Sequence, residues 1–130
     1  MPAVEDEKLL LEAKRAAGNA YAPYSGFPVG AALLGEDGTI FTGCNMENAS
    51  YGLTICAERV ALGKAVSEGV RRFRALAVWA PVASWPCGAC LQCLAEFAPG
   101  LRILRGGEDG VRESTTLAEI FPASFRLAGS

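Results

Sequence analysis

The order of helix-like and strand-like segments constrains the fold of this chain more than any other feature. In some segments apolar residues recur every three to four positions, and in others they alternate or run continuously, which are the patterns of helices and strands. Because the two kinds of segment alternate, a sheet with helices packed on its faces is expected. Helices are predicted at 5–19, 55–67, 87–97 and 116–121, and strands at 29–34, 39–44, 74–80 and 101–105, with a weaker fifth at 110–115.

Turn and cap signals set the borders of several of these segments. Gly35-Glu36-Asp37-Gly38 separates the first two strands, and Asp-Gly is a strong signal for a β-hairpin turn. Thr54 is expected to cap the helix over residues 55–67, and Gly69 to end it. The run at 74–80 is apolar throughout, as expected of a strand that is covered on both faces.

The composition favours one domain and argues against several classes of protein. With 130 residues, no repeat and no long linker, residues 1–130 are expected to form a single domain. No apolar run approaches the roughly 18 residues of a membrane span. The acidic start, Met1 to Glu7, is not followed by the apolar region of a signal peptide, so a cytoplasmic location is expected. A net charge of −2 without a basic stripe argues against a nucleic-acid partner.

The chain has five cysteines and no histidine. An odd number of cysteines without a secretory signal indicates thiols in a reducing compartment rather than a disulfide framework. Cys44, at the end of a predicted strand, is interpreted as a small buried apolar residue. The lack of histidine excludes a Ser-His-Asp triad, a Cys-His dyad and every histidine-ligated metal site.

Two short segments carry three of the thiols at the starts of predicted helices. They are Cys56-Ala57-Glu58 and Pro86-Cys87-Gly88-Ala89-Cys90. Three thiolates from two helix N-termini can bind one tetrahedral Zn²⁺ and leave its fourth position free, as a catalytic zinc site requires. A structural zinc site would not need Glu58, whereas metal-assisted hydrolysis needs a carboxylate that moves a proton of water.

The C-x-x-C pair alone is compatible with other roles. Cys87 and Cys90 resemble a thioredoxin redox centre at a helix N-terminus, and Cys93 extends the spacing to the beginning of an iron–sulfur run. The fourth cysteine of that run is missing, and a thioredoxin motif is expected near the start of its domain. Cys56 and Glu58 therefore favour zinc, with Cys93 as a small buried apolar residue. A non-enzymatic zinc or thiol redox module is an alternative, and it predicts no role for Glu58.

Taken together, the motifs resemble those of the small homotetrameric cytidine deaminases that act on free nucleosides. The matching segments, at 24–33, 45–48, 56–59 and 86–90, have the order and spacing of the family. The resemblance implies an α/β fold, a three-layer α/β/α sandwich with a mixed five-stranded sheet. It also implies a homotetramer with intersubunit active sites and one Zn²⁺ per subunit. The implied reaction is hydrolytic deamination of cytidine or deoxycytidine to uridine or deoxyuridine and ammonia, a step of pyrimidine salvage.

The same resemblance assigns the metal ligands and the proton carrier. It implies that Cys56, Cys87 and Cys90 bind zinc and that Glu58 shuttles protons. Arg59 adjoins Glu58 on the same predicted helix, and its guanidinium can donate hydrogen bonds to thiolate sulfurs behind the metal.

Contacts with a nucleoside are implied for five further residues. Asn45 and Glu47 hold the ribose hydroxyls, and Phe27 packs on the pyrimidine. Ala57 leaves space for the base and offers its backbone N–H to the pyrimidine carbonyl. Phe125, close to the C-terminus, is expected to reach the site of a neighbouring subunit.

Two positions depart from the family pattern. Leu91 follows the last zinc cysteine where the family usually has arginine, and Trp85 precedes Pro86 atypically. Another small-molecule zinc deaminase, of the blasticidin type, would use the same metal ligands with a different pocket, although Asn45 and Glu47 favour a ribose. A nucleic-acid-editing deaminase would need a basic groove, which the charge does not supply.

Overall fold

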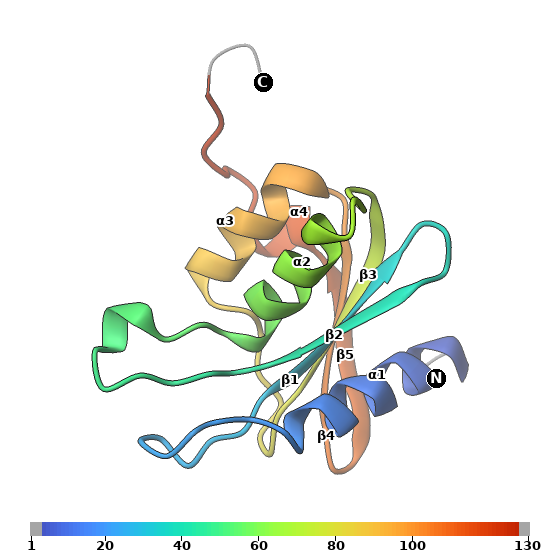
Figure 1. Cartoon of the computed structure of the whole chain (residues 1–130). Coiled ribbons are helices and arrows are strands. Elements are labelled where there is room, and N and C mark those ends of the chain that lie inside the picture. Colours follow the sequence, from blue (N-terminus) through green and yellow to red (C-terminus); the bar gives the residue numbers. More distant parts are fainter. Residues whose placement is uncertain (1–3, 128–130) are drawn as a thin grey trace.

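The computed structural model describes residues 4–127 (Figure 1). Met1 to Ala3 of the acidic start, and residues 128–130 at the other end of the predicted domain, lie outside the described residues. The helices are α1 (Val4–Ala17), the 3-10 helix η1 (Tyr51–Leu53), α2 (Ala57–Ser67), α3 (Gly88–Phe97) and α4 (Leu117–Ile120). The strands are β1 (Gly30–Gly35), β2 (Ile40–Cys44), β3 (Phe73–Trp79), β4 (Arg102–Gly107) and β5 (Gly110–Thr116). Within residues 4–127, no helix combines the length and the apolar character needed to cross a bilayer.

The strands form one mixed sheet in the order β2-β1-β3-β4-β5. Strands β3 and β4 are parallel, joined through α3, and the other neighbours are antiparallel. Strand β5, only weakly predicted, pairs with β4 along its length, with Glu113 opposite Arg105. The predicted five-stranded mixed sheet is therefore confirmed.

Helices cover both faces of the sheet and give the predicted three layers (Figure 1). On one face α1 packs Leu9, Leu10 and Ala13 against alternate residues of the strands. On the other face, α2 and α3 pack against a larger cluster that includes Leu33 and Leu76. Because side chains alternate along a strand, neighbouring residues of β1 belong to different clusters. The face under α2 and α3 is the one that carries the candidate site.

Glycines let a helix lie directly against the backbone of a strand on each face. A Cβ on Gly30 of β1 would lie 1.8 Å from the carbonyl oxygen of Ala13 in α1. A Cβ on Gly43 of β2 would lie 2.4 Å from the carbonyl oxygen of Ala57, the first residue of α2. This close approach holds the N-terminus of α2 against the sheet.

Helix α2 begins two residues later than predicted, and the prediction that Thr54 caps it is wrong. Ile55 exchanges backbone hydrogen bonds of 2.9 and 3.0 Å with Met46, so it is held in an extended bridge. The Thr54 hydroxyl instead accepts from the backbone N–H of Asn48 at 3.1 Å. Cys56 is the N-cap residue. The long-range bridge to Met46 thus overrides the local cap signal.

Candidate metal centre

Three thiols meet where α2 and α3 begin. The Sγ atoms of Cys56, Cys87 and Cys90 all lie within 4.8 Å of one another. Cys87 lies 4.0 Å from Cys56 and 3.6 Å from Cys90, measured between sulfurs. Four ligands at a Zn–S distance of about 2.3 Å in a tetrahedron are about 3.8 Å apart. The three thiols therefore fit one Zn²⁺ and leave one position for another ligand.

The helix N-termini place two of these thiols. Cys56 is the N-cap of α2 and Cys87 is the N-cap of α3, and neither side chain makes the usual hydrogen bond to its own first turn. Both thiols are therefore available to a metal. The positive end of each helix dipole also favours a thiolate over a thiol.

Hydrogen bonds within the site stabilise a negative charge on Cys56. The Cys90 thiol, and then Arg59, donate to this sulfur and lower the pKa of Cys56 to about 5, although partial burial opposes the shift. The Arg59 Nη2 atom lies 3.6 Å from the Cys56 sulfur. As the donor to Cys56, and because it is buried, Cys90 has a raised pKa. The site therefore favours a negative charge on the Cys56 sulfur.

Glu58 lies in the first turn of α2 and is only 5% exposed. Burial raises the pKa of Glu58 to about 7, and the charge of Cys56 contributes in the same direction. A carboxyl with a pKa near the working pH can both accept and donate a proton. The structure therefore places a carboxyl of this kind beside the three thiols.

Asn45, predicted to contact a ribose, also holds the backbone of the preceding loop. It is buried, and its Oδ1 accepts from the Val29 N–H at 3.0 Å. Its Nδ2 donates to the Phe27 carbonyl oxygen at 3.0 Å. Asn45 thus fixes the segment that carries Phe27, a role that its position in the sequence did not indicate.

Glu47 is held by a residue that the sequence analysis did not single out. Its Oε1 accepts from the backbone N–H groups of Tyr24, at 2.9 Å, and Ser25, at 3.0 Å, and its Oε2 accepts from the Ser25 hydroxyl. The Ser25 hydroxyl, the leading cause, and these N–H groups keep the pKa of Glu47 below its usual value. Ser25 Oγ also accepts from the Phe27 N–H at 3.0 Å. The Tyr24-Ser25 pair in the first matching segment was the only signal for this network.

Comparison with known proteins decides the family. Residues 3–103 match the family model described as "Cytidine and deoxycytidylate deaminase zinc-binding region". The chain belongs to this deaminase family. The cytidine deaminase of Sporosarcina psychrophila is 55% identical over 124 residues, which are 92% of this chain and 90% of that protein. The cytidine deaminase of Mycobacterium tuberculosis H37Rv is 49% identical over 129 residues, 98% of this chain and 94% of that protein.

Solved structures of cytidine deaminases have the same fold. The enzyme from Burkholderia pseudomallei superposes with a TM-score of 0.86 at 46% identity, over 91% of this chain and 97% of that one. The enzyme from Mycobacterium tuberculosis gives a TM-score of 0.83 at 41% identity, over 96% of this chain and 100% of that one. The α/β deaminase fold expected from the sequence is therefore confirmed.

The other residues expected from the deaminase motifs lie in different surroundings. Ala57 is fully buried and is the first residue of α2, so its N–H has no acceptor within the helix. Phe27 is half-buried. Phe125 is exposed, and its backbone exchanges hydrogen bonds of 3.0 and 3.3 Å with the Gln92 side chain of α3. Its contact with a neighbouring subunit's site stays a prediction.

The two remaining cysteines lie apart from the three-thiol group. Among the described residues, the metal-compatible set contains neither Cys44 nor Cys93. Both are half-buried rather than fully buried, and Cys93 packs against the core on the α2 and α3 face. The prediction that Cys93 is not a ligand agrees with this placement.

Proposed function

We propose that this member of the deaminase family converts cytidine or deoxycytidine to uridine or deoxyuridine by zinc-dependent hydrolysis. The observation that carries the proposal is a group of three thiols within 4.8 Å of one another beside a buried carboxyl, Glu58, that is not among them. When bound by Cys56, Cys87 and Cys90, a zinc ion supplies a hydroxide nucleophile by lowering the pKa of water from about 15.7 towards 7.

Glu58 is proposed to carry the protons of the reaction. It takes one proton from the attacking water and gives it to N3 as C4 is attacked. It then takes the proton of the new C4 hydroxyl and delivers it to the amino group, which leaves as ammonia. Its pKa of about 7 suits both directions of transfer. A structural zinc site or a redox module would have no use for a buried, proton-carrying carboxyl at this point.

The loops beside the site are proposed to bind the nucleoside. Glu47 Oε2 accepts one hydrogen bond, from Ser25, and so retains capacity for a ribose hydroxyl. The second N–H of Asn45 Nδ2 can donate to the same hydroxyl. Phe27 would pack its ring on the base, and the free Ala57 N–H would bind the pyrimidine carbonyl. A ribose fits these groups better than the substrate of a blasticidin-type deaminase would.

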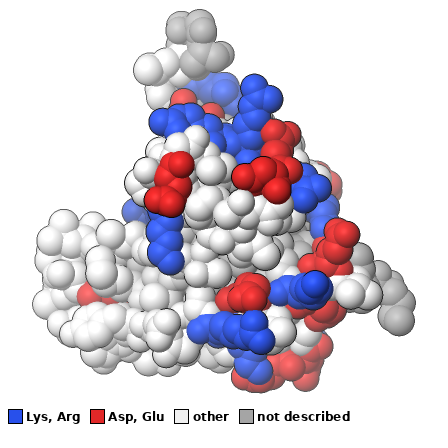
Figure 2. All heavy atoms as spheres, turned by 45° about the vertical axis from the view of Figure 1, so that its right-hand side comes forward, with Lys and Arg blue, Asp and Glu red and all other residues white. Residues whose placement is uncertain are grey.

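A homotetramer with intersubunit active sites is proposed from the exposed apolar surface. The loops around η1 form a lobe that is almost free of charge, at the left of Figure 2. Its aromatic and aliphatic side chains are at least half exposed: Tyr21, Tyr24, Met46, Tyr51 and Leu53. Exposed apolar surface of this kind is typical of an interface. Neighbouring copies would cover it and bring Phe125 to the open side of the site.

The remaining partners and the location follow from charge and thiol chemistry. Figure 2 shows acidic and basic side chains intermingled on the face in view, without a basic stripe. A free nucleoside is therefore proposed as the partner, with neither a nucleic acid nor a membrane. A reducing cytoplasm is proposed because the three thiols must stay reduced to bind metal.

The function can be tested by measuring zinc content together with the fall in ultraviolet absorbance when cytidine or deoxycytidine is added. We expect one zinc per chain and turnover of at least one of the two nucleosides. Glu58→Gln is expected to keep zinc and lose nearly all turnover, because an amide cannot accept the proton. Most of the activity surviving in Glu58→Gln would exclude the mechanism.

Two cysteine variants provide matched controls for the ligand assignment. Cys87→Ala is expected to lose zinc and activity together, whereas Cys93→Ala should keep both. Loss of zinc from Cys93→Ala with retention in Cys56→Ala would show that the wrong thiols had been assigned. Stoichiometric zinc with no turnover of either nucleoside would favour a different small-molecule substrate.

A further inference from the structure

Residues 80–86 connect β3 to Cys87 without regular secondary structure. Val82 is exposed near the start of this loop, whereas Trp85 packs against the core on the α2 and α3 face and Pro86 is buried. Cys87 itself is exposed. The position of its thiol therefore depends on the contacts that hold the loop.

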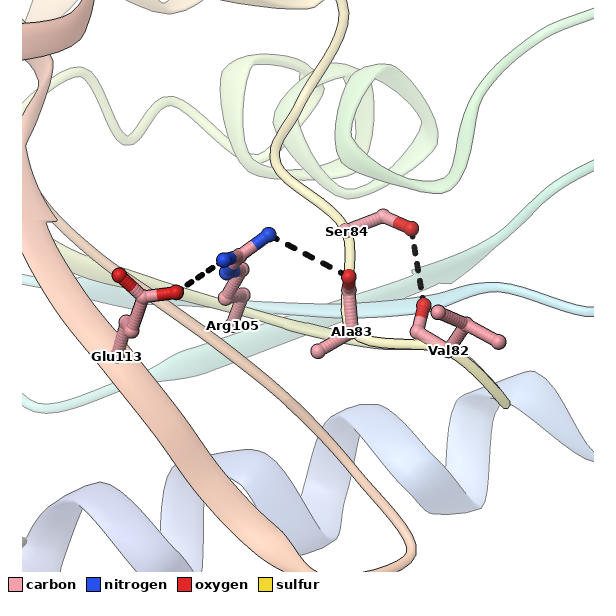
Figure 3. Close-up of polar contacts among 5 residues, drawn as sticks. All are labelled: Val82, Ala83, Ser84, Arg105 and Glu113. Carbon is pink, nitrogen blue, oxygen red and sulfur yellow. Dashed lines mark hydrogen bonds and ion pairs between the residues drawn. The ribbon is translucent and has the colours of Figure 1, made fainter.

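Arg105 of β4 makes the long-range polar contacts with this loop. Its guanidinium lies over the Trp85 ring, 4.5 Å from the ring centroid. Its Nη1 donates to the Ala83 carbonyl oxygen at 3.4 Å, and its Nη2 forms an ion pair with Glu113 of β5. Figure 3 shows the guanidinium between the Glu113 carboxylate and the loop. One side chain thus connects the edge of the sheet to the segment that precedes a metal ligand.

The ion pair with Glu113 contributes less to holding Arg105 than the contacts with the loop do. The side chain of Arg105 is 26% exposed, whereas that of Glu113 is 55% exposed, so solvent weakens their attraction. Arg105 Nε is buried and has no hydrogen-bond partner within the described residues, which is a cost. The stacking on Trp85 and the bond to Ala83 offset this cost.

We propose that Arg105 is a positioning residue for the metal centre. By holding Trp85 and Ala83, it fixes the loop so that the Cys87 thiol stays in place between the other two thiols. Pro86 has a restricted φ angle, so a displacement of Trp85 is passed on to Cys87. The inference rests on the proposed metal centre. It also gives a role to Trp85, which departs from the family pattern.

The test is the rate at which zinc-loaded protein transfers its metal to an excess of the chromogenic chelator 4-(2-pyridylazo)resorcinol. Arg105→Met keeps the length of the side chain but loses its charge and its donors. We expect it to release zinc about tenfold faster, as when groups behind metal ligands are removed. Its kcat should fall with KM little changed. Arg105→Lys, which keeps a cation over the ring but lacks the fork, should release zinc at an intermediate rate.

Arg102→Met is the matched control. Arg102 lies on the same strand and pairs with a carboxylate, Asp6, but it does so on the opposite face of the sheet. Its loss should lower the free energy of unfolding without changing zinc release. Release from Arg105→Met no faster than from the wild type or from Arg102→Met would overturn the proposal.

A second variant tests the same contact from the other side. Trp85→Leu removes the aromatic face and should also release zinc faster, and it serves as the test if Arg105→Met does not fold. The double variant should release zinc no faster than the faster single variant, because both changes break one contact. Two effects that simply multiply, or wild-type release from Trp85→Leu, would overturn the proposal. Failure of the wild type to retain zinc would instead contradict the metal centre.

Discussion

Among the described residues, each face of the sheet has one buried carboxylate with an arginine near it, but the two sites are arranged differently. On the α1 face, Asp6 accepts hydrogen bonds on both carboxylate oxygens from the guanidinium of Arg102. On the α2 face, Arg59 donates to the sulfur of Cys56. Glu58 has no ion pair within residues 4–127, and its burial raises its pKa to about 7. The two carboxylates are 7% and 5% exposed, so burial alone does not distinguish them.

The difference separates a group that supports the fold from one that supports the chemistry. A buried carboxylate that accepts hydrogen bonds from an arginine adds to stability. A buried carboxylate without such a partner is costly when charged, and that cost is what brings its pKa to the working range. The α2 face therefore gives up stability to keep a carboxyl with a raised pKa, as the proposed proton carrier requires, while the α1 face does not.

The largest effect is expected from Glu58→Gln in the metal-free protein. Glu58 binds its proton more tightly in the folded chain, at a pKa of about 7, than at its ordinary value of 4.5. The stability that this gives is complete below pH 4.5 and is lost as the pH rises through 7. Glu58→Gln cannot ionise, so we expect it to unfold with a free energy about 3 kcal/mol higher than the wild type at pH 8.

Urea unfolding of both metal-free proteins at two pH values isolates this effect. At pH 5 the advantage of Glu58→Gln should fall to about 1 kcal/mol. Any packing effect of the amide is independent of pH, so the change between the two pH values is the decisive quantity. A stability advantage that stays constant from pH 5 to pH 8 would show that burial does not raise the pKa of Glu58.

Asp6→Asn should have an effect of opposite sign and smaller size. It removes the charge-assisted bonds to Arg102, which is partly exposed and can be solvated in the variant. We expect the free energy of unfolding to fall by about 2 kcal/mol at pH 8, and by less at high salt. Zinc content and turnover should stay at the wild-type level. A loss of zinc from Asp6→Asn would show that the two faces are not independent.

Most of the fold could be predicted because its signals are local. Apolar periodicity and the turn at Gly38 located strands β1 to β4 and the α-helices of the described residues. The error at the start of α2 arose because Ile55 pairs with Met46, nine residues earlier along the chain, and a cap signal carries no information about that bridge. The weakness of the fifth-strand prediction has a similar reason, since Gly110–Thr116 is largely polar and is a strand through its pairing with β4.

The site was predictable only where residue type and spacing carry the chemistry. The three thiols and Glu58 followed from two short motifs. The contact between Ser25 and Glu47 joins residues 22 positions apart, and Arg105 contacts Ala83 from the same distance along the chain. For Ser25 the only signal was its place in a motif, and for Arg105 there was none, because each contact depends on how the loops return to the sheet.

The smallest effect is expected from Arg59, the arginine that pairs with sulfur instead of a carboxylate. Its bond to Cys56 offsets part of the negative charge of three thiolates, and no arginine stands at position 91 to share this role. In Arg59→Gln that charge is less well compensated, so a further loss of a proton at the site becomes harder. We expect stoichiometric zinc, turnover lower by up to about tenfold, and a rising limb of the pH–rate profile displaced to higher pH.

Arg59→Lys keeps the charge and should restore the position of the limb more than the turnover, because an ammonium lacks the planar fork. Unchanged turnover and an unchanged pH–rate profile in Arg59→Gln would show that Arg59, like Arg102 on the other face, does not affect the reaction.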